Sequence, residues 1–131
     1  MVAYQGEKMS KSLGNLVKVS ELVAAGHDPR AVRLGLLAHH YRSDREWFDA
    51  DLVAAEQRLG RWLAWAATSE GGAVPVTAPT PLVVALRSSL ADDLDTPSAL
   101  DAVDAVVSRR TAPSEVDVDA VQALLGIDLR A

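Results

Sequence analysis

Two lysines near the start of the chain lie three residues apart among small hydroxyl side chains. Lys8 and Lys11 flank Ser10, and Ser12 and Gly14 follow the second lysine. Lysine supplies a mobile point charge, and hydroxyls with exposed backbone N–H groups add directional hydrogen bonds. Preplaced cations also stabilise the charge that develops during adenylyl transfer. The spacing therefore suits a loop that holds a polyphosphate, although a generic lysine pair near serines is more often a solvated surface turn.

The segments around this loop have strand and turn signals. Residues 1–4 are β-prone and lead into a turn at residues 5–7, and residues 16–19 read as a second short strand. Ser20 is a good N-cap for a short helix that Gly26 would end. We therefore expect a strand, the loop, a strand and a helix in this order.

From Asp28 the sequence becomes helical. Asp28 is a predicted N-cap with Pro29 at the first helical position, and Asp49 is the predicted cap of a longer helix. Glycines and prolines near residues 70–81 predict a linker. Beyond it, Thr96-Pro97 predicts a cap with a first-turn proline, and a last helix begins near Ser114. Apolar residues recur at helical spacing in these helices: Val32, Leu36, Leu37 and Tyr41; Leu52, Ala55, Leu59, Trp62 and Ala66; Leu82, Leu86, Leu90 and Leu94; Leu100, Val103 and Val107; Val118, Val121 and Leu125.

These patterns predict a mainly α fold. A short β and loop segment that carries the lysine–serine loop precedes a bundle of amphipathic helices. We predict two regions, residues 1–48 and residues 49–131, with the Gly/Pro linker inside the second. At 131 residues the chain can bury a sizeable core without staples.

Composition narrows the possible functions. The chain has no cysteine, which excludes a disulfide framework, a thiol nucleophile and any cysteine-bearing zinc site within it. No apolar run approaches the ~18 residues of a membrane span, and no signal peptide opens the chain, so we expect a cytoplasmic protein without membrane contact. The net charge of −5 is uneven: residues 1–65 hold nine Lys/Arg against eight Asp/Glu, whereas residues 66–131 hold four against ten.

Three other groups of residues have a simpler structural interpretation. His39 and His40 point roughly 100° apart on a helix and have no acidic or thiol partner at ligand spacing, so a packing or surface role is favoured and no metal site is predicted. Trp62 falls on an apolar stripe, which favours core packing over the base-stacking platform that Trp47, Trp62 and Trp65 could otherwise form. Asp92, Asp93 and Asp95 cluster at a helix end, where solvated acids are common.

Lys8-Met9-Ser10-Lys11-Ser12 matches the signature loop of class I aminoacyl-tRNA synthetases letter for letter. Residues 36–43 and 92–100 resemble segments of the cysteine-specific branch, the cysteinyl-tRNA synthetases. Within that branch the residues before and after the loop, and residues 42–47, look more like the actinobacterial cysteine ligases of mycothiol biosynthesis. These join cysteine to the amine of glucosaminyl-inositol. The resemblance covers most of the chain, and it likens residues 49–131 to the C-terminal helical domain of class Ia synthetases.

This resemblance implies roles for individual residues. Lys11 would contact the β- and γ-phosphates of ATP, with Lys8, Met9, Ser10 and Ser12 shaping the loop, and Val2 would present backbone groups to adenine. Lys8 and Lys11 are the implied catalytic residues. ATP with Mg²⁺, cysteine and glucosaminyl-inositol are the implied ligands of the parent enzyme. Its zinc ligands and nucleotide-binding fold would lie outside this chain, which we therefore expect to be an inactive C-terminal fragment.

Two alternatives stay open. A cysteinyl-tRNA synthetase shares the same motifs, but a tRNA-binding helical domain needs a basic face, and the acidic second half disfavours it without excluding a basic stripe. A non-catalytic helical interaction module with a vestigial loop is the alternative from another class.

Overall fold

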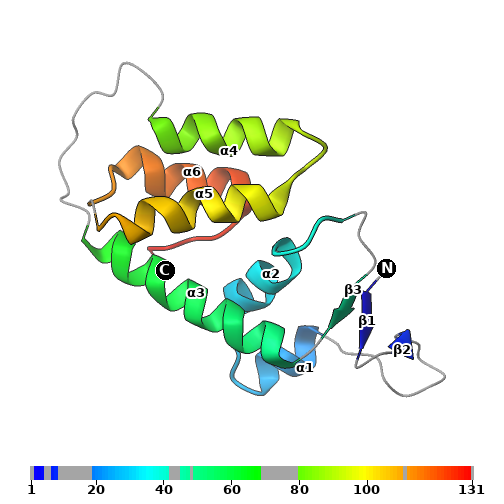
Figure 1. The fold of residues 1–131 in the computed structure, drawn as a ribbon. Helices are drawn as coiled ribbons and strands as arrows, with labels where there is room; N and C mark the ends of the chain where they lie inside the picture. The colour runs from blue at the N-terminus through cyan, green and yellow to red at the C-terminus, as the bar shows by residue number, and fades with distance from the viewer. Residues whose placement is uncertain are drawn as a thin grey trace.

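Helices make up most of the chain that the computed structural model describes, namely residues 2–4, 7–8, 19–41, 45–47, 49–68, 80–110 and 112–130. A small sheet lies beside them (Figure 1). The mainly α fold class is confirmed, while the proposed boundary at residues 48 and 49 stays a prediction. The elements are β1 (Val2–Tyr4), β2 (Glu7–Lys8), α1 (Val19–Ala24), α2 (Pro29–Leu37), β3 (Arg45–Trp47), α3 (Asp49–Ala67), α4 (Pro81–Ala91), α5 (Thr96–Ser108) and α6 (Glu115–Leu125).

The sheet has the strand order β2-β1-β3. β1 pairs antiparallel with β2, with Ala3 opposite Lys8, and parallel with β3, with Tyr4 opposite Trp47. The parallel pair requires a crossover, and α1 and α2 supply it in sequence. The strand expected at residues 1–4 is therefore confirmed, whereas Glu7, expected in a turn, belongs to β2.

Side-chain caps explain where several helices begin. Asp28 accepts a hydrogen bond from the Arg30 N–H at 2.9 Å, with Pro29 as the first residue of α2, so that predicted cap is confirmed. Ser114 opens α6 in a capping box with Asp117, also as expected near this residue. α3 begins at Asp49 itself, one residue earlier than a cap at that position would give.

The predicted cap of α5 is wrong by one residue. Asp95, rather than Thr96, is the N-cap, because its carboxylate accepts from both the backbone N–H of Ser98 at 3.2 Å and its hydroxyl at 2.6 Å. Thr96 is instead the first residue of the helix. Each oxygen of the Asp95 carboxylate accepts from one of the two Ser98 donors.

Other boundaries also differ from the sequence expectation. Val19, expected at the end of a strand, begins α1, so Ser20 lies inside the helix rather than capping it; residues 16–18 lie outside the described residues. Gly26, with a φ of 99°, ends the helical segment of α1 as predicted, and the N–H of His27 donates to the carbonyl of Leu22.

Three apolar residues assigned to helix stripes face solvent. α2 ends at Leu37, so Tyr41 lies beyond it and is 56% exposed, while Leu36 is 45% exposed. Leu94 follows the end of α4 with a φ of 54° and is 54% exposed. Tyr41 and Leu94 continue the apolar periodicity past the end of their helices, whereas Leu36 lies inside α2 on its exposed side.

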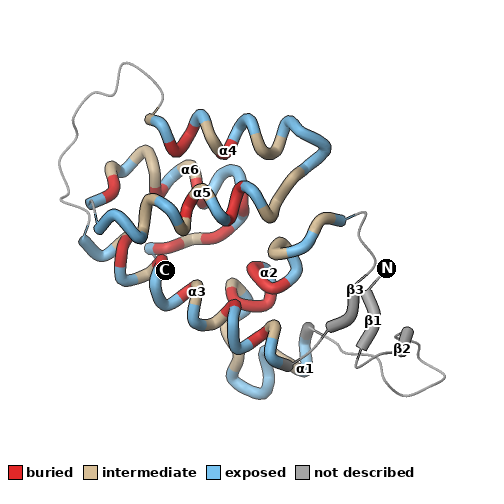
Figure 2. Tube along the Cα trace, viewed as in Figure 1, coloured by how far each residue is buried: buried red, intermediate tan, exposed pale blue. Residues whose placement is uncertain are grey.

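The core lies where α2 and α5 pack against α3, and where α4 packs against α5 and α6. Figure 2 shows the buried positions on the facing sides of these helices. Trp62 is completely buried, and its Nε1 donates to the Asp104 carboxylate at 2.7 Å. Trp65 is also buried, so neither residue can serve as a base-stacking platform, and the side chain of Trp47 lies outside the described part. Core packing for Trp62 is thus confirmed.

A C-terminal tail after α6 completes the core, which the sequence reasoning missed. Ile127 and Leu129 are buried, and the Arg30 Nη1 donates to the carbonyl of Asp128 at 2.7 Å. Arg33 donates through Nε to the carbonyl of Leu125 at 2.6 Å. Two arginines of α2 thereby fix the end of α6 and the tail. Among the described residues, no helix is both long enough and apolar enough to cross a membrane.

Candidate nucleotide-binding loop and its support

The predicted phosphate-binding residues fall only partly within the described chain. Val2 lies in β1 and Lys8 in β2, two adjacent strands in which Ala3 is opposite Lys8. Met9, Ser10, Lys11 and Ser12 lie outside the described residues, as do the side chains of Val2 and Lys8. The structure therefore brings the backbones of two candidate residues into one sheet, and the ATP contacts of all six stay predictions.

The sheet that leads into the loop is small, so its position depends on the elements attached to it. Its strands have two or three residues each, and a hairpin of that size has little stability alone. β3 supports the central strand β1 from the side opposite β2. In sequence, β3 follows Tyr41 by a few residues and precedes α3, which ties it covalently to the bundle.

Residues 39–41, just after α2, contact the turn between α4 and α5. The Tyr41 hydroxyl donates to Asp93 Oδ1 at 2.6 Å, and His40 Nε2 lies 2.8 Å from the carbonyl oxygen of Asp93. The two rings stack with centroids 4.7 Å apart. The Thr96 hydroxyl donates to the carbonyl of His39 at 3.4 Å. We call this set of contacts between residues 39–41 and 93–96 the junction.

The junction joins the two segments that the sequence resemblance had singled out separately. It also explains His40, whose ring stacks on Tyr41 and hydrogen-bonds to Asp93 at the surface, in line with the packing or surface role expected for it. Within the described residues, no group of three or more His, Cys, Asp or Glu side chains is arranged to hold a metal ion.

The turn on the other side of the junction is conformationally unusual. Asp93 and Leu94 both have positive φ, at 51° and 54°. Left-handed backbone at non-glycine residues is uncommon and costs on the order of 1 kcal/mol or more per residue. Next to them, hydrogen bonds from Ser98 to the Asp95 carboxylate lower the pKa of Asp95. The turn is thus held by several polar contacts in a shape that its sequence alone would not favour.

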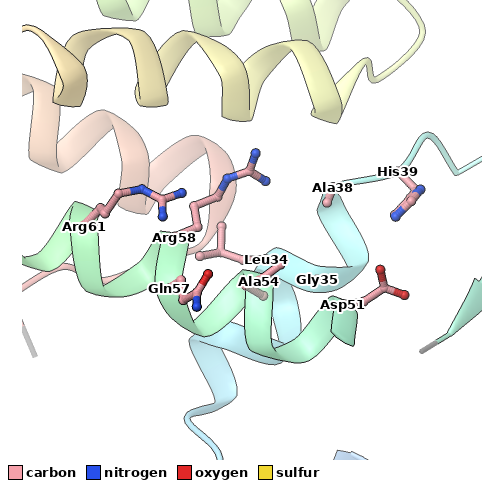
Figure 3. Close-up of a pocket in the computed structure, with 10 residues that line it drawn as sticks. Leu34, Gly35, Ala38, His39, Asp51, Ala54, Gln57, Arg58 and Arg61 are labelled. Atoms are coloured by element: carbon pink, nitrogen blue, oxygen red, sulfur yellow. The ribbon is translucent and has the colours of Figure 1, made fainter. Parts of the chain in front are cut away.

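A cavity of about 280 Å³ lies between α2 and α3 (Figure 3). Arg58 and Arg61 extend from successive turns of α3 at one end, and His39 and Asp51 lie at the other. Four of the residues that line this cavity are small. They are Gly35, Ala38, Ala54 and Ala55, and nothing in their sequence pattern predicted a cavity.

Arg58, one of the two arginines that line this cavity, is paired with carboxylates of α5. Its Nη2 lies 2.9 Å from the Asp104 carboxylate, which also accepts from Trp62, and 3.9 Å from Asp101. These carboxylates offset the charge of the Arg58 guanidinium.

Comparison with known proteins places the chain. The family described as tRNA synthetases class I (C) catalytic domain matches residues 1–57. A relative from Clavibacter michiganensis subsp. michiganensis, named L-cysteine:1D-myo-inositol 2-amino-2-deoxy-alpha-D-glucopyranoside ligase, is 56% identical over 129 residues. The chain is similar to this cysteine ligase over nearly its whole length. Proteins of the same name from Nakamurella multipartita and Thermobifida fusca are 52% and 53% identical.

The match to these ligases covers nearly all of the chain but only part of each relative. It includes 98% of the chain in all three comparisons, and 30% of the relative from Clavibacter michiganensis, 30% of that from Nakamurella multipartita and 32% of that from Thermobifida fusca. The chain thus spans about a third of the length of the curated relatives it matches, and the loop residues fall inside the part matched as a catalytic domain.

Proposed function

We propose that this chain supplies the ATP-phosphate loop and the helical region of an ATP-dependent ligase that couples cysteine to the amine of glucosaminyl-inositol. The observation that carries the proposal is the loop Lys8-Met9-Ser10-Lys11-Ser12, within a chain 56% identical to a ligase of that name. The strand pairing of β1 and β2, which brings Val2 and Lys8 into adjacent strands, supports a loop that leaves a sheet edge.

In the proposed reaction the cysteine carboxylate attacks the α-phosphate of ATP, which forms cysteinyl adenylate and releases pyrophosphate. Lys11 binds the β- and γ-phosphates and offsets the charge that develops on the departing pyrophosphate, with Lys8 beside it. The sugar amine then attacks the adenylate carbonyl, forms the amide and releases AMP. Backbone groups of Val2 orient adenine, and Met9, Ser10 and Ser12 shape the loop around the phosphates.

The ligands of any metal ion in this reaction would lie outside the loop. The five loop residues include no carboxylate, so Mg²⁺ would be carried by the ATP phosphates and by groups elsewhere. The chain also has no cysteine, so zinc thiolate ligands of the complete enzyme would lie in other parts of it. We accordingly propose that the 131-residue chain alone is inactive; cysteine-dependent ATP turnover by the chain alone would refute this point.

A chimera tests the proposal directly. The chain replaces the matching 129 residues of the Clavibacter michiganensis ligase, and cysteine-dependent ATP–pyrophosphate exchange is measured. We expect Lys11→Ala to lower kcat/KM for ATP by about 10²- to 10³-fold, the usual cost of removing a preorganised charge stabiliser. Lys18→Ala, outside the loop, is the matched control and should have no effect. Unchanged turnover in Lys8→Ala and Lys11→Ala would favour a non-catalytic helical module instead.

The same chimera separates the two possible acceptors. We expect glucosaminyl-inositol, and not tRNA, to become cysteinylated. Cysteinylation of tRNA would instead support the cysteinyl-tRNA synthetase alternative. The charge of residues 66–131 favours the small acceptor, because ten acidic against four basic side chains offer few partners for RNA phosphates.

A further inference from the structure

We propose that Tyr41 and Asp93 are positioning residues: their hydrogen bond in the junction sets the place of β3, and through it the strands that lead into the lysine–serine loop. The effect on the loop rests on the proposed function. The effect on the strands does not.

The first step of the argument is that the junction contact is built rather than incidental. Tyr41 is 56% exposed, so apolar burial does not hold it in place. Instead its hydroxyl donates to Asp93 at 2.6 Å, and the stacked ring of its neighbour His40 lies 2.8 Å from the carbonyl of the same aspartate. Asp93 in the α4–α5 turn thus contacts the side chains of both Tyr41 and His40. A hydrogen bond to a charged carboxylate is among the stronger ones that a protein surface offers.

The second step concerns the shape of the turn. Asp93 and Leu94 hold successive left-handed conformations without glycine, and strain of this kind persists only where the surroundings impose it. A turn that merely connected α4 to α5 could use glycine at both positions at lower cost. The strained backbone directs the Asp93 carbonyl and carboxylate toward residues 40 and 41, so the cost accompanies a specific contact.

The third step follows the contact to the sheet. Arg45 begins β3 four residues after Tyr41, and β3 pairs in parallel with β1, which places Val2 opposite Arg45. β1 in turn pairs with β2, which ends at Lys8. Strands this short have little stability of their own, so the point from which β3 departs has a large influence on where all three lie. At that point the junction attaches Tyr41, and so the chain that leads into β3, to the α4–α5 turn of the bundle.

The strands test the positioning role in the 131-residue chain itself. Amide hydrogen exchange and amide chemical shifts are measured for residues 2–4, 7–8 and 45–47 in Tyr41→Phe and in Asp93→Gly. We expect exchange at these amides to be about three- to tenfold faster, as the net contribution of one typical hydrogen bond implies. Asp93→Asn keeps an acceptor oxygen, so its strand amides should exchange at rates close to those of the unmodified chain. Amides in the core, such as those of Leu86 and Val103, should not change.

Ser98→Ala is the matched control. It removes a hydrogen bond within the same turn, from the Ser98 hydroxyl to Asp95, without touching residues 39–41. If Tyr41→Phe and Asp93→Gly leave the strand amides as unaffected as Ser98→Ala does, the junction only braces the bundle and the proposal is wrong. Tyr41→Phe deletes one exposed hydroxyl, so its result does not depend on whether the glycine variant folds.

The chimera described above tests the consequence for the loop. Tyr41→Phe should raise the KM for ATP at least about threefold while leaving the KM for cysteine unchanged, because only the strands that lead into the lysine–serine loop are displaced. A purely structural role would instead lower the active fraction, and so kcat, without changing the KM for ATP. An inactive unmodified chimera would count against the proposed function, while the strand amides would still decide the positioning role.

Discussion

The helical bundle and the three-stranded sheet are stabilised in opposite ways. In the bundle, nearly every helix contributes a buried apolar face, and Trp62 of α3 also hydrogen-bonds to Asp104 of α5. In the sheet, strands of two or three residues depend on elements far away in sequence, from α2 to the α4–α5 turn. The bundle thus holds most of the stability, while Val2 and Lys8, the two described residues proposed for chemistry, lie in the sheet. Stability and function can therefore be changed separately in this chain.

The largest effect should come from the centre of the bundle. Trp62→Ala removes a completely buried indole and its 2.7 Å hydrogen bond to Asp104, and we expect it to lower the free energy of unfolding by about 3–5 kcal/mol. Urea unfolding followed by circular dichroism measures this. Trp62→Phe, which keeps most of the volume, should cost clearly less. A loss below about 1 kcal/mol for the alanine variant would show that the core does not depend on this residue.

A smaller effect separates two glycines of the bundle. Gly126 has a φ of 73°, and a Cβ there would lie 2.7 Å from Arg33 Nε, which donates to the carbonyl of Leu125. We expect Gly126→Ala to destabilise the chain by about 1–2 kcal/mol, from left-handed strain and displacement of the arginine. Gly60, inside α3 with open space at its Cβ, is the control. Gly60→Ala should stabilise by about 0.5–1 kcal/mol, and equal effects in thermal unfolding would contradict the explanation.

The smallest effect concerns pH and the start of α2. The hydrogen bond from Arg30 lowers the pKa of Asp28, so this carboxylate stabilises the fold above its unfolded pKa, near 4, and the contribution is lost as the pH falls through the lowered value. Asp28 is 36% exposed, and solvent screening limits the contribution to about 0.5 kcal/mol. Asp28→Asn, still a good cap, should flatten this part of the pH profile in urea unfolding between pH 3 and 6. An unchanged profile would assign the dependence to other carboxylates.

The same contrast explains what could be predicted from the sequence. Helix caps and apolar spacing are local, so Asp28, Ser114 and the buried face of α3 were predicted from their neighbours alone. Errors arose where a local pattern runs past the end of an element. Leu94 continues the leucine spacing of α4, but the chain has already turned at Asp93.

Features that depend on distant partners were missed. Arg45–Trp47 has no apolar alternation, and it becomes a strand through its pairing with β1. Ile127 and Leu129 are buried because the tail meets α2, which no local pattern indicates. The candidate loop was predicted from the identity of its five residues to a known signature loop. Its physical features alone, two lysines among serines, would not have distinguished it from a surface turn.

The contact between α2 and the tail also orders events in time. Arg30 and the Asp128 carbonyl that it binds are 98 residues apart, and at about 5–20 residues per second the second group leaves the ribosome at least several seconds after the first. During synthesis Arg30 can pair with Asp28 at once, whereas the contacts of Arg30 and Arg33 with the carbonyls of Asp128 and Leu125 must wait for the end of α6. The tail thus closes the fold around α2 only once the last helix has been made.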